Sequence, residues 1–247
     1  MSTGSDRDVN AFLDELEADP GYQRRRAKLD SERERIVGIN RADATPLAEE
    51  LRRAGFAVDF PDDLYGQGVD YQAAIPVLID WLPRMENLDV KCGIVRALSV
   101  EWARPAAALP LVQEYRRALN MNSIQHDMLR ADIANALDVV ADPSVAEELM
   151  SFVTDKRSSD EARSMLLRAL GNAKSATAAR FVADRLADET DPQVLVGGLV
   201  ALRRLRDANV RDTVDHLLSH VDRGVQREAI RTAKALDRAG RPGPAVE

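Results

Sequence analysis

One apolar helix recurs along the C-terminal two thirds of the chain, and it constrains the fold more than any other feature. Its clearest copy covers 191–206, where Asp191 and Pro192 open a helix that continues QVLVGGLVALRRLR. Four other segments align with it on the residue equivalent to Val194. The five anchor residues, separated by 39, 33, 32 and 31 residues, are Val90, Leu129, Ala162, Val194 and Val225. Such spacing is typical of a solenoid built from helical repeats.

Each anchor helix follows another amphipathic segment, so from residue 71 onward the pattern is helix, turn, helix, five times over. The first helices are predicted at 73–83, 106–119, 144–154, 176–187 and 210–221. The second helices are predicted at 88–102, 124–140, 160–171, 192–206 and 225–239. In the last first helix one apolar face comprises Val210, Val214, Leu217, Leu218 and Val221. A unit of this size cannot bury such a face alone, so we predict an all-α, right-handed solenoid of about five stacked helix pairs.

The chain is expected to have three parts. Residues 1–70 are predicted to form a helical extension that caps the array, 71–239 the array, and 240–247 a tail that frays. In the extension, Thr45 and Pro46 predict the start of a helix that Gly55 ends.

The charged segment before Thr45 has one apolar pattern. Tyr22, Leu29 and Ile36 repeat every seven residues among charged neighbours. These side chains could pack on the first repeat of the array, or they could join two copies of the chain as a dimerisation arm. The sequence leaves both readings open.

Aromatic side chains are few, at 4% of the residues, which suits closely spaced small helices better than a sheet core. Phe56, Phe60 and Tyr65 are predicted to pack a turn between the extension and the array. Trp81 and Trp102 lie beside apolar neighbours and are predicted to belong to the core at the start of the array.

The charge balance bears on the partner. The net charge is −7, with 34 basic residues among 41 acidic ones, whereas a dedicated nucleic-acid binder has a basic excess. A single cysteine, Cys92, excludes an intrachain disulfide and suits a reducing compartment. No signal-peptide pattern and no apolar run of membrane-spanning length is present, so we expect a cytoplasmic protein without a membrane partner.

The repeats resemble HEAT repeats in their short bacterial form. The resemblance is carried by the helix pairs, by the opening at Asp191, and by the endings VRAL, LRAL and VAL at Val95, Leu167 and Val200. It covers roughly 71–239, and the N-terminal portion is similar to that of uncharacterised bacterial HEAT-repeat proteins. The resemblance implies that the chain binds another macromolecule on a concave face lined by second helices. We predict a scaffold without catalytic activity or cofactor, whose concave face holds a protein partner.

Two positions in each second helix are candidates for that face. One residue after the anchor, the sequence has Lys91, Arg130, Arg163, Leu195 and Gln226. Six residues after the anchor, it has Arg96, Asn135, Arg168, Val200 and Arg231. We predict a basic track interrupted by the apolar residues Leu195, Val196 and Val200, which suits an acidic peptide or helix with one apolar anchor.

The alternative is a purely structural role, in which these arginines bridge neighbouring repeats and the apolar residues are buried under an adjacent helix. Gly197 and Gly198 bear on this choice, because two glycines inside a helix cost about 1 kcal/mol each relative to alanine. Close helix packing is the usual reason for such glycines. Room for a bound partner is the less common one.

Other candidate sites are weak. His216 and His220 stand four residues apart near Asp212, but these three cannot ligate one ion because they span about 12 Å of helix. We therefore predict no metal site. Cys92 has no recognisable histidine partner and is predicted to be structural.

Enzymes with HEAT-like repeats provide the main functional alternative. Deoxyhypusine hydroxylases need His-Glu pairs, and this chain has none; nothing identifies the pigment site of a bilin lyase. Alkylpurine DNA glycosylases use a basic, aromatic-lined concave face. The basic track resembles theirs faintly, so the alternative to a protein scaffold is a nucleic-acid binder or DNA-repair relative.

Overall fold

The computed structural model describes residues 12–13, 16–66, 68 and 70–239, and within these ranges the secondary structure is helical, with no strand. The chain divides into two compact units, Met1–Thr45 and Pro46–Glu247. The predicted tail, 240–247, lies outside the described residues.

Helix α2 (Pro20–Arg53) passes through the position where a new helix was predicted to start. Thr45 does not act as a helix cap: its Oγ1 donates to the carbonyl oxygen of Arg41, and Pro46 lies inside the helix. The prediction of a helix start at Thr45 is therefore wrong. Proline in a helix interior removes one hydrogen bond, and the boundary between the two compact units falls at this peptide.

The seven-residue pattern in the first unit lies on α2. Leu29 and Ile36 are exposed by 60% and 40%, and Tyr22 is half-buried. Docking on the first repeat and pairing with a second copy both stay predictions for this face.

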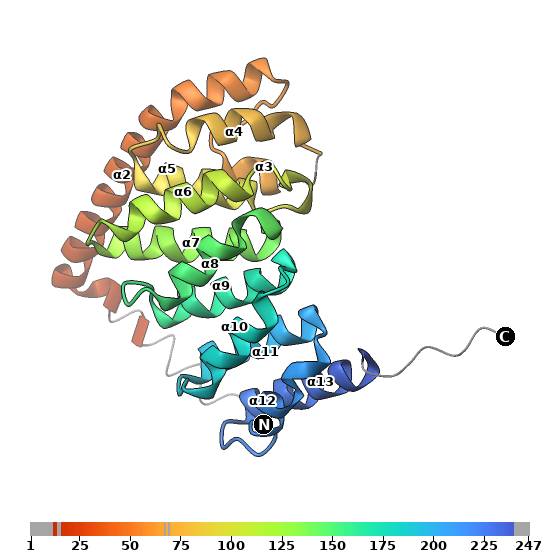
Figure 1. The fold of residues 1–247 in the computed structure, drawn as a ribbon. Coiled ribbons are helices and arrows are strands. Elements are labelled where there is room, and N and C mark those ends of the chain that lie inside the picture. The colour runs from red at the N-terminus through yellow and green to blue at the C-terminus, as the bar shows by residue number, and fades with distance from the viewer. Residues whose placement is uncertain (1–11, 14–15, 67, 69, 240–247) are drawn as a thin grey trace. The chain divides into compact units, whose positions relative to one another are not determined.

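The second unit contains the repeat array (Figure 1). After α3 (Asp62–Gly66), five helix pairs follow in chain order. The first helices are α4 (Ile75–Trp81), α6 (Ala108–Leu119), α8 (Ala146–Thr154), α10 (Ala178–Ala187) and α12 (Arg211–Asp215). The second helices are α5 (Leu88–Leu98), α7 (Ile124–Val140), α9 (Asp160–Ala173), α11 (Pro192–Leu205) and α13 (Arg223–Ala239). The all-α solenoid architecture is confirmed.

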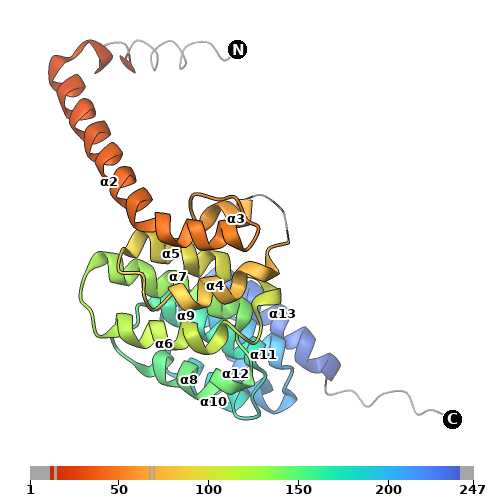
Figure 2. The ribbon, with the colours of Figure 1, turned by 90° about the horizontal axis from the view of Figure 1, so that it is seen from above.

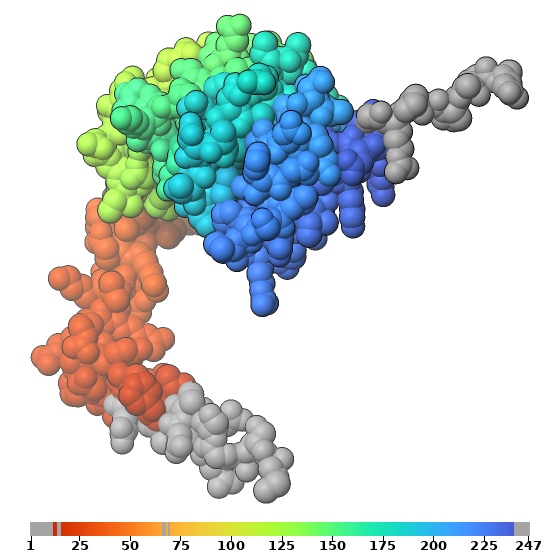
Figure 3. All heavy atoms as spheres, turned by 60° about the horizontal axis from the view of Figure 1, so that its bottom comes forward, coloured from red at the N-terminus to blue at the C-terminus, as the bar shows by residue number. Residues whose placement is uncertain are grey.

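The array has two layers. Seen along the stack, the first helices lie on one side and the second helices on the other (Figure 2). Each second helix packs along the next, from α5 to α13, whereas consecutive first helices touch one another little. In the space-filling view the repeats appear as adjoining bands of colour from green to blue (Figure 3).

The second helices begin where the sequence predicts because short polar side chains cap them. The Asp191 carboxylate accepts hydrogen bonds from the backbone N–H groups of Gln193 and Val194. Asn87 and Ser159 cap α5 and α9 in the same way. Each cap satisfies N–H groups that a helix start leaves unpaired, and each precedes a buried anchor residue.

Helix α12 is much shorter than predicted. It covers Arg211–Asp215 instead of 210–221, and turns follow it. Val221 is 95% exposed in the turn before α13, so its assignment to the buried face is wrong. At this end of the array no further described repeat covers the first helix, which removes the partner that would bury a longer apolar face.

Two aromatic assignments are also wrong. Trp102 is 45% exposed, although its ring meets the buried Tyr71 edge to face at 5.6 Å. Tyr65 is 67% exposed at the end of α3 and does not pack the turn. Trp81 is half-buried, and its indole N–H donates to the Glu50 carboxylate at 2.9 Å.

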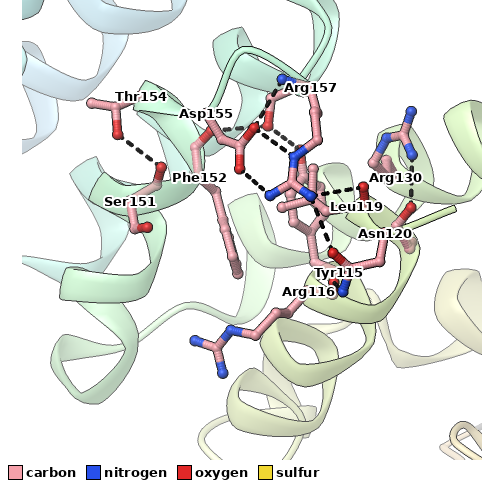
Figure 4. A network of polar contacts seen from close by, with 12 residues as sticks. Tyr115, Arg116, Leu119, Asn120, Arg130, Ser151, Phe152, Thr154, Asp155 and Arg157 are labelled. Atoms are coloured by element: carbon pink, nitrogen blue, oxygen red, sulfur yellow. Dashed lines mark hydrogen bonds and ion pairs between the residues drawn. The ribbon is translucent and has the colours of Figure 1, made fainter. Parts of the chain in front are cut away.

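A polar network joins the second and third repeats (Figure 4). The Arg157 guanidinium, between α8 and α9, donates to Asp155, to the Leu119 carbonyl and to the Asn120 side chain at the end of α6. Beneath it, the buried Tyr115 hydroxyl lies 2.9 Å from the Ser158 hydroxyl. These bonds tie a turn of one repeat to a helix end of the previous one.

Candidate functional site

The structure separates the two positions that were predicted to form one basic track. We call the residues one place after the anchor the inner row: Lys91, Arg130, Arg163, Leu195 and Gln226. We call the residues six places after the anchor the outer row: Arg96, Asn135, Arg168, Val200 and Arg231. The inner row is mostly buried among the helices, and the outer row faces solvent to varying degrees.

The polar residues of the inner row bond to neighbouring helices and turns of the array. Lys91 and Glu114 form a buried ion pair between α5 and α6. Arg130, 6% exposed, donates to the carbonyl oxygens of Ala118 and Met121 and so satisfies the end of α6.

The other inner-row residues behave alike. Arg163 is half-buried and pairs with Asp160 and Glu189, and the side-chain amide of Gln226 donates to the Leu218 carbonyl after α12. Leu195 is 1% exposed. Lys91, Arg130 and Leu195 are therefore too deeply buried to make the partner contacts that were predicted for them.

The outer row is accessible, and carboxylates of neighbouring residues position its arginines. Arg96 donates to Asp62 of α3 and to Asp132 of α7 while about half of its side chain stays exposed. Its hydrogen bonds to Asp62 raise the pKa of the Arg96 guanidinium. The same residue therefore bridges three helices and presents a cation at the surface.

Two buried acids organise the C-terminal repeats. Asp138 of α7, 8% exposed, pairs with both Arg168 of α9 and Arg204 of α11. Glu228 of α13, 7% exposed, pairs with both Arg203 of α11 and Arg231 of its own helix. Because each carboxylate neutralises only one of its two arginines, each group keeps a positive charge.

The apolar part of the candidate face lies on α11. Val196 and Val200 stand one helical turn apart and are half-buried, while Leu195 points into the core. The two glycines of α11 face neighbouring helices: a Cβ on Gly197 would lie 2.4 Å from the Ser164 carbonyl oxygen of α9, and one on Gly198 would lie 2.5 Å from Leu186 of α10. Close helix packing explains these glycines.

A basic cleft, absent from the sequence-based prediction apart from Arg231, lies where α9, α11 and α13 meet. Its volume is about 870 Å³. We define it by its lining residues: Asn172, Lys174, Arg203, Arg204, Leu205, Arg206, Arg231, Lys234, Ala235 and Arg238. The signal in the sequence is the basic run after Leu202 and the cations in the last turns of α13.

The fold does not complete a set of metal ligands around His216 and His220 among the described residues. Within the described part of the chain, no three His, Cys, Asp or Glu side chains are grouped as a metal site. His216 is exposed, and the His220 Nδ1 accepts a hydrogen bond from the Asp222 backbone N–H.

Cys92 is buried in α5, and burial raises the pKa of its thiol to about 12. A raised pKa favours the neutral thiol. At pH 8 the thiolate fraction of Cys92 is therefore about a thousandfold below that of a thiol with a pKa of about 9. We expect native protein to react with a thiol reagent such as iodoacetamide far more slowly than urea-unfolded protein. Mass spectrometry of timed samples measures both rates. Native labelling within about tenfold of the unfolded rate would contradict the burial of a neutral thiol.

No helix among the described residues is both long and apolar enough to span a bilayer.

The second unit is thus a helical-repeat solenoid with a layer of second helices and a basic cleft at its C-terminal end. No protein-family model matches the chain, and no curated protein matches it. Among solved structures, the chain is similar to a designed armadillo repeat protein, YIII(Dq)4CqI, with 16% identity over 78% of this chain and 92% of that chain, at a TM-score of 0.48. The finer assignment to short bacterial HEAT repeats stays a prediction.

Proposed function

We propose that this protein is a non-catalytic, cytoplasmic scaffold that binds a protein partner on the outer row and the exposed face of α11. One observation carries the proposal. Val196 and Val200 form a partly exposed apolar strip on the helix between Arg168 of α9 and Arg231 of α13. An apolar strip flanked by cations suits a partner segment that has one apolar anchor and acidic neighbours.

The arginines beside the strip are held in advance of binding. The buried carboxylates of Asp138 and Glu228 fix Arg168 and Arg231, which are 42% and 69% exposed. Side chains that are already ordered lose less conformational entropy when a partner binds. This favours a preformed binding surface over an incidental scatter of surface charge. The cytoplasmic placement is proposed from the use of a single cysteine, which is buried and forms no disulfide.

Affinity capture tests the proposal. The tagged protein is incubated with a lysate of its source organism, with and without nuclease, and the retained molecules are identified. We expect a specific protein that survives nuclease treatment and whose recovery falls at least about tenfold with Val200→Asp, because a carboxylate cannot fill an apolar contact and repels acidic neighbours.

The matched control is Ala187→Asp, which adds the same charge at an exposed position of α10 in the other layer. It should leave recovery unchanged, and circular dichroism verifies that both variants are folded. Equal recovery with Val200→Asp and wild type would refute the proposed surface. Retained nucleic acid, or protein that is lost on nuclease treatment, would instead favour the nucleic-acid alternative.

A further inference from the structure

The basic cleft has an uncompensated positive charge. The acids that pair with its lining arginines are Asp138 and Glu228, and each is already shared by two arginines. The remaining cations lining the cleft are Lys174, Arg206, Lys234 and Arg238. All four are exposed, and none has an ion-pair partner within the described ranges. A concentration of free cations in a chain of net charge −7 needs an explanation.

Two of these cations occupy backbone positions that favour glycine. Lys174 and Arg206 end α9 and α11 in the left-handed conformation, with φ of 50° and 57°. They are the only non-glycine residues with positive φ in the part of the chain that the structure describes, and they stand at the same place in successive repeats. Glycine is the usual residue there because a Cβ strains this conformation.

The helix dipole accounts for these cations only in part. A positive charge beside a helix C-terminus is favourable, and α9 has no basic residue in its last turn, so Lys174 serves that role. Helix α11, however, already has Arg203 and Arg204 in its last turn. Arg206 is therefore a further cation at a position where glycine would relieve strain, which points to a role outside folding.

We propose that the basic cleft binds an acidic peptide segment of the partner, with glutamate or aspartate side chains between α11 and α13 and an apolar side chain over Leu205 and Ala235. This deepens the proposed function, on which it rests, by naming the chemistry of one part of the partner. Arginine and lysine side chains that converge on a concave surface can each donate hydrogen bonds to a carboxylate, and arginine can donate two parallel ones.

A peptide fits this cleft better than a nucleic acid. The lining has no aromatic side chain on which a base could stack. The acidic excess lies on the rest of the chain, so a long polyanion that extends beyond the cleft meets repulsion, whereas a short segment interacts only with charges within about one Debye length, roughly 8 Å. Leu205 and Ala235 also offer an apolar contact that phosphates do not use.

Fluorescence anisotropy with the full chain tests the proposal. The probe is a labelled peptide of about ten residues, spanning at most about 35 Å when extended, with glutamate throughout except for one central leucine. We expect saturable binding at low salt that weakens as ionic strength rises, and no binding of the same peptide with glutamine in place of glutamate. A thymidine oligonucleotide of equal charge is measured in parallel.

The informative variant is Lys174→Gly with Arg206→Gly. Glycine removes both charges and also relieves the left-handed conformation, so we expect about a tenfold loss of peptide affinity, or about 1.4 kcal/mol, with an unchanged or higher melting temperature. The matched control is Arg53→Gln with Arg185→Gln, which removes two exposed charges from α2 and α10 and should not affect binding. Lys234→Gln with Arg238→Gln probes the same cleft from α13 without touching a helix cap.

Three results would overturn the proposal. The peptide fails to bind, both cleft variants bind it like wild type, or the oligonucleotide binds more tightly and responds to the same variants. The last result would make the cleft a nucleic-acid site. Because the probe is synthetic, failure of the peptide to bind does not affect the result of the affinity capture. If the capture retains no protein but the peptide binds, the scaffold function is refuted and the proposed role of the cleft is not.

Discussion

Glu114→Gln is expected to destabilise the protein by about 3–5 kcal/mol, the largest effect of any single change that we predict. Glu114 is 4% exposed and is the carboxylate that neutralises Lys91, itself 10% exposed. Glutamine preserves the shape of the side chain but removes its charge. The ammonium group of Lys91 is then left buried beside an amide, which cannot compensate it.

Urea denaturation followed by circular dichroism measures the loss. The control is Lys91→Met with Glu114→Met, which replaces the pair by apolar side chains of similar length. Because such replacements are often neutral, the double variant should be markedly more stable than Glu114→Gln alone. A Glu114→Gln protein within about 1 kcal/mol of wild type would mean that Lys91 reaches solvent, and would return it to the list of partner contacts.

The repeat pattern predicted the array because each part of it is a local property of the sequence. All five anchor residues are at most 3% exposed: Val90, Leu129, Ala162, Val194 and Val225. Asp191 opens α11 as predicted, and Asn87, Ser123 and Ser159 cap α5, α7 and α9. Burial of one stripe and capping of one end depend on residues within a few turns, so a single sequence contains that information.

The predicted binding track was partly wrong because it joined residues that cannot share a helix face. The inner and outer rows are five positions apart, which places them about 140° apart around a helix. One row must then face the first helices when the other faces solvent. Lys91 and Arg96 illustrate the result: the first is buried against α6, and the second is exposed across α3 and α7.

The basic cleft could not be predicted, since it depends on three helices and on two backbone conformations. Lys174 and Arg238 are far apart in the chain, and only the stacking of α9, α11 and α13 brings them to one cleft. The left-handed caps at Lys174 and Arg206 carry residues that local preference disfavours. Pro46 shows the same limit, because the surrounding helix formers continue α2 through a residue that usually begins a helix.

Gly197→Ala is expected to destabilise the protein by about 2 kcal/mol, although alanine is the better helix former by about 1 kcal/mol. The new Cβ would lie 2.4 Å from the Ser164 carbonyl oxygen and 2.8 Å from its Cα, both backbone atoms of α9. Backbone atoms of a packed helix cannot rotate away, so α9 and α11 must separate and lose apolar contact.

Gly198→Ala is the matched control in the same helix. Its Cβ would meet the terminal methyl of Leu186 at 2.5 Å, and that side chain can adopt another rotamer. The gain in helix propensity then offsets most of the strain, so we expect a change within about 1 kcal/mol. Thermal unfolding should give a melting temperature roughly 4–8 °C below wild type for Gly197→Ala and a much smaller shift for Gly198→Ala.

The difference between the two glycines also bears on function. If Gly197 allows the close approach of α9 and α11, Gly197→Ala should increase the distance between these helices. Because both helices line the basic cleft together with α13, the variant should also bind the acidic peptide more weakly. Equal stability of the two variants would show that the backbone of α9 can shift at Ser164 to make room for the new Cβ. In that case the spacing of the second helices is adjustable, and a partner could set it on binding.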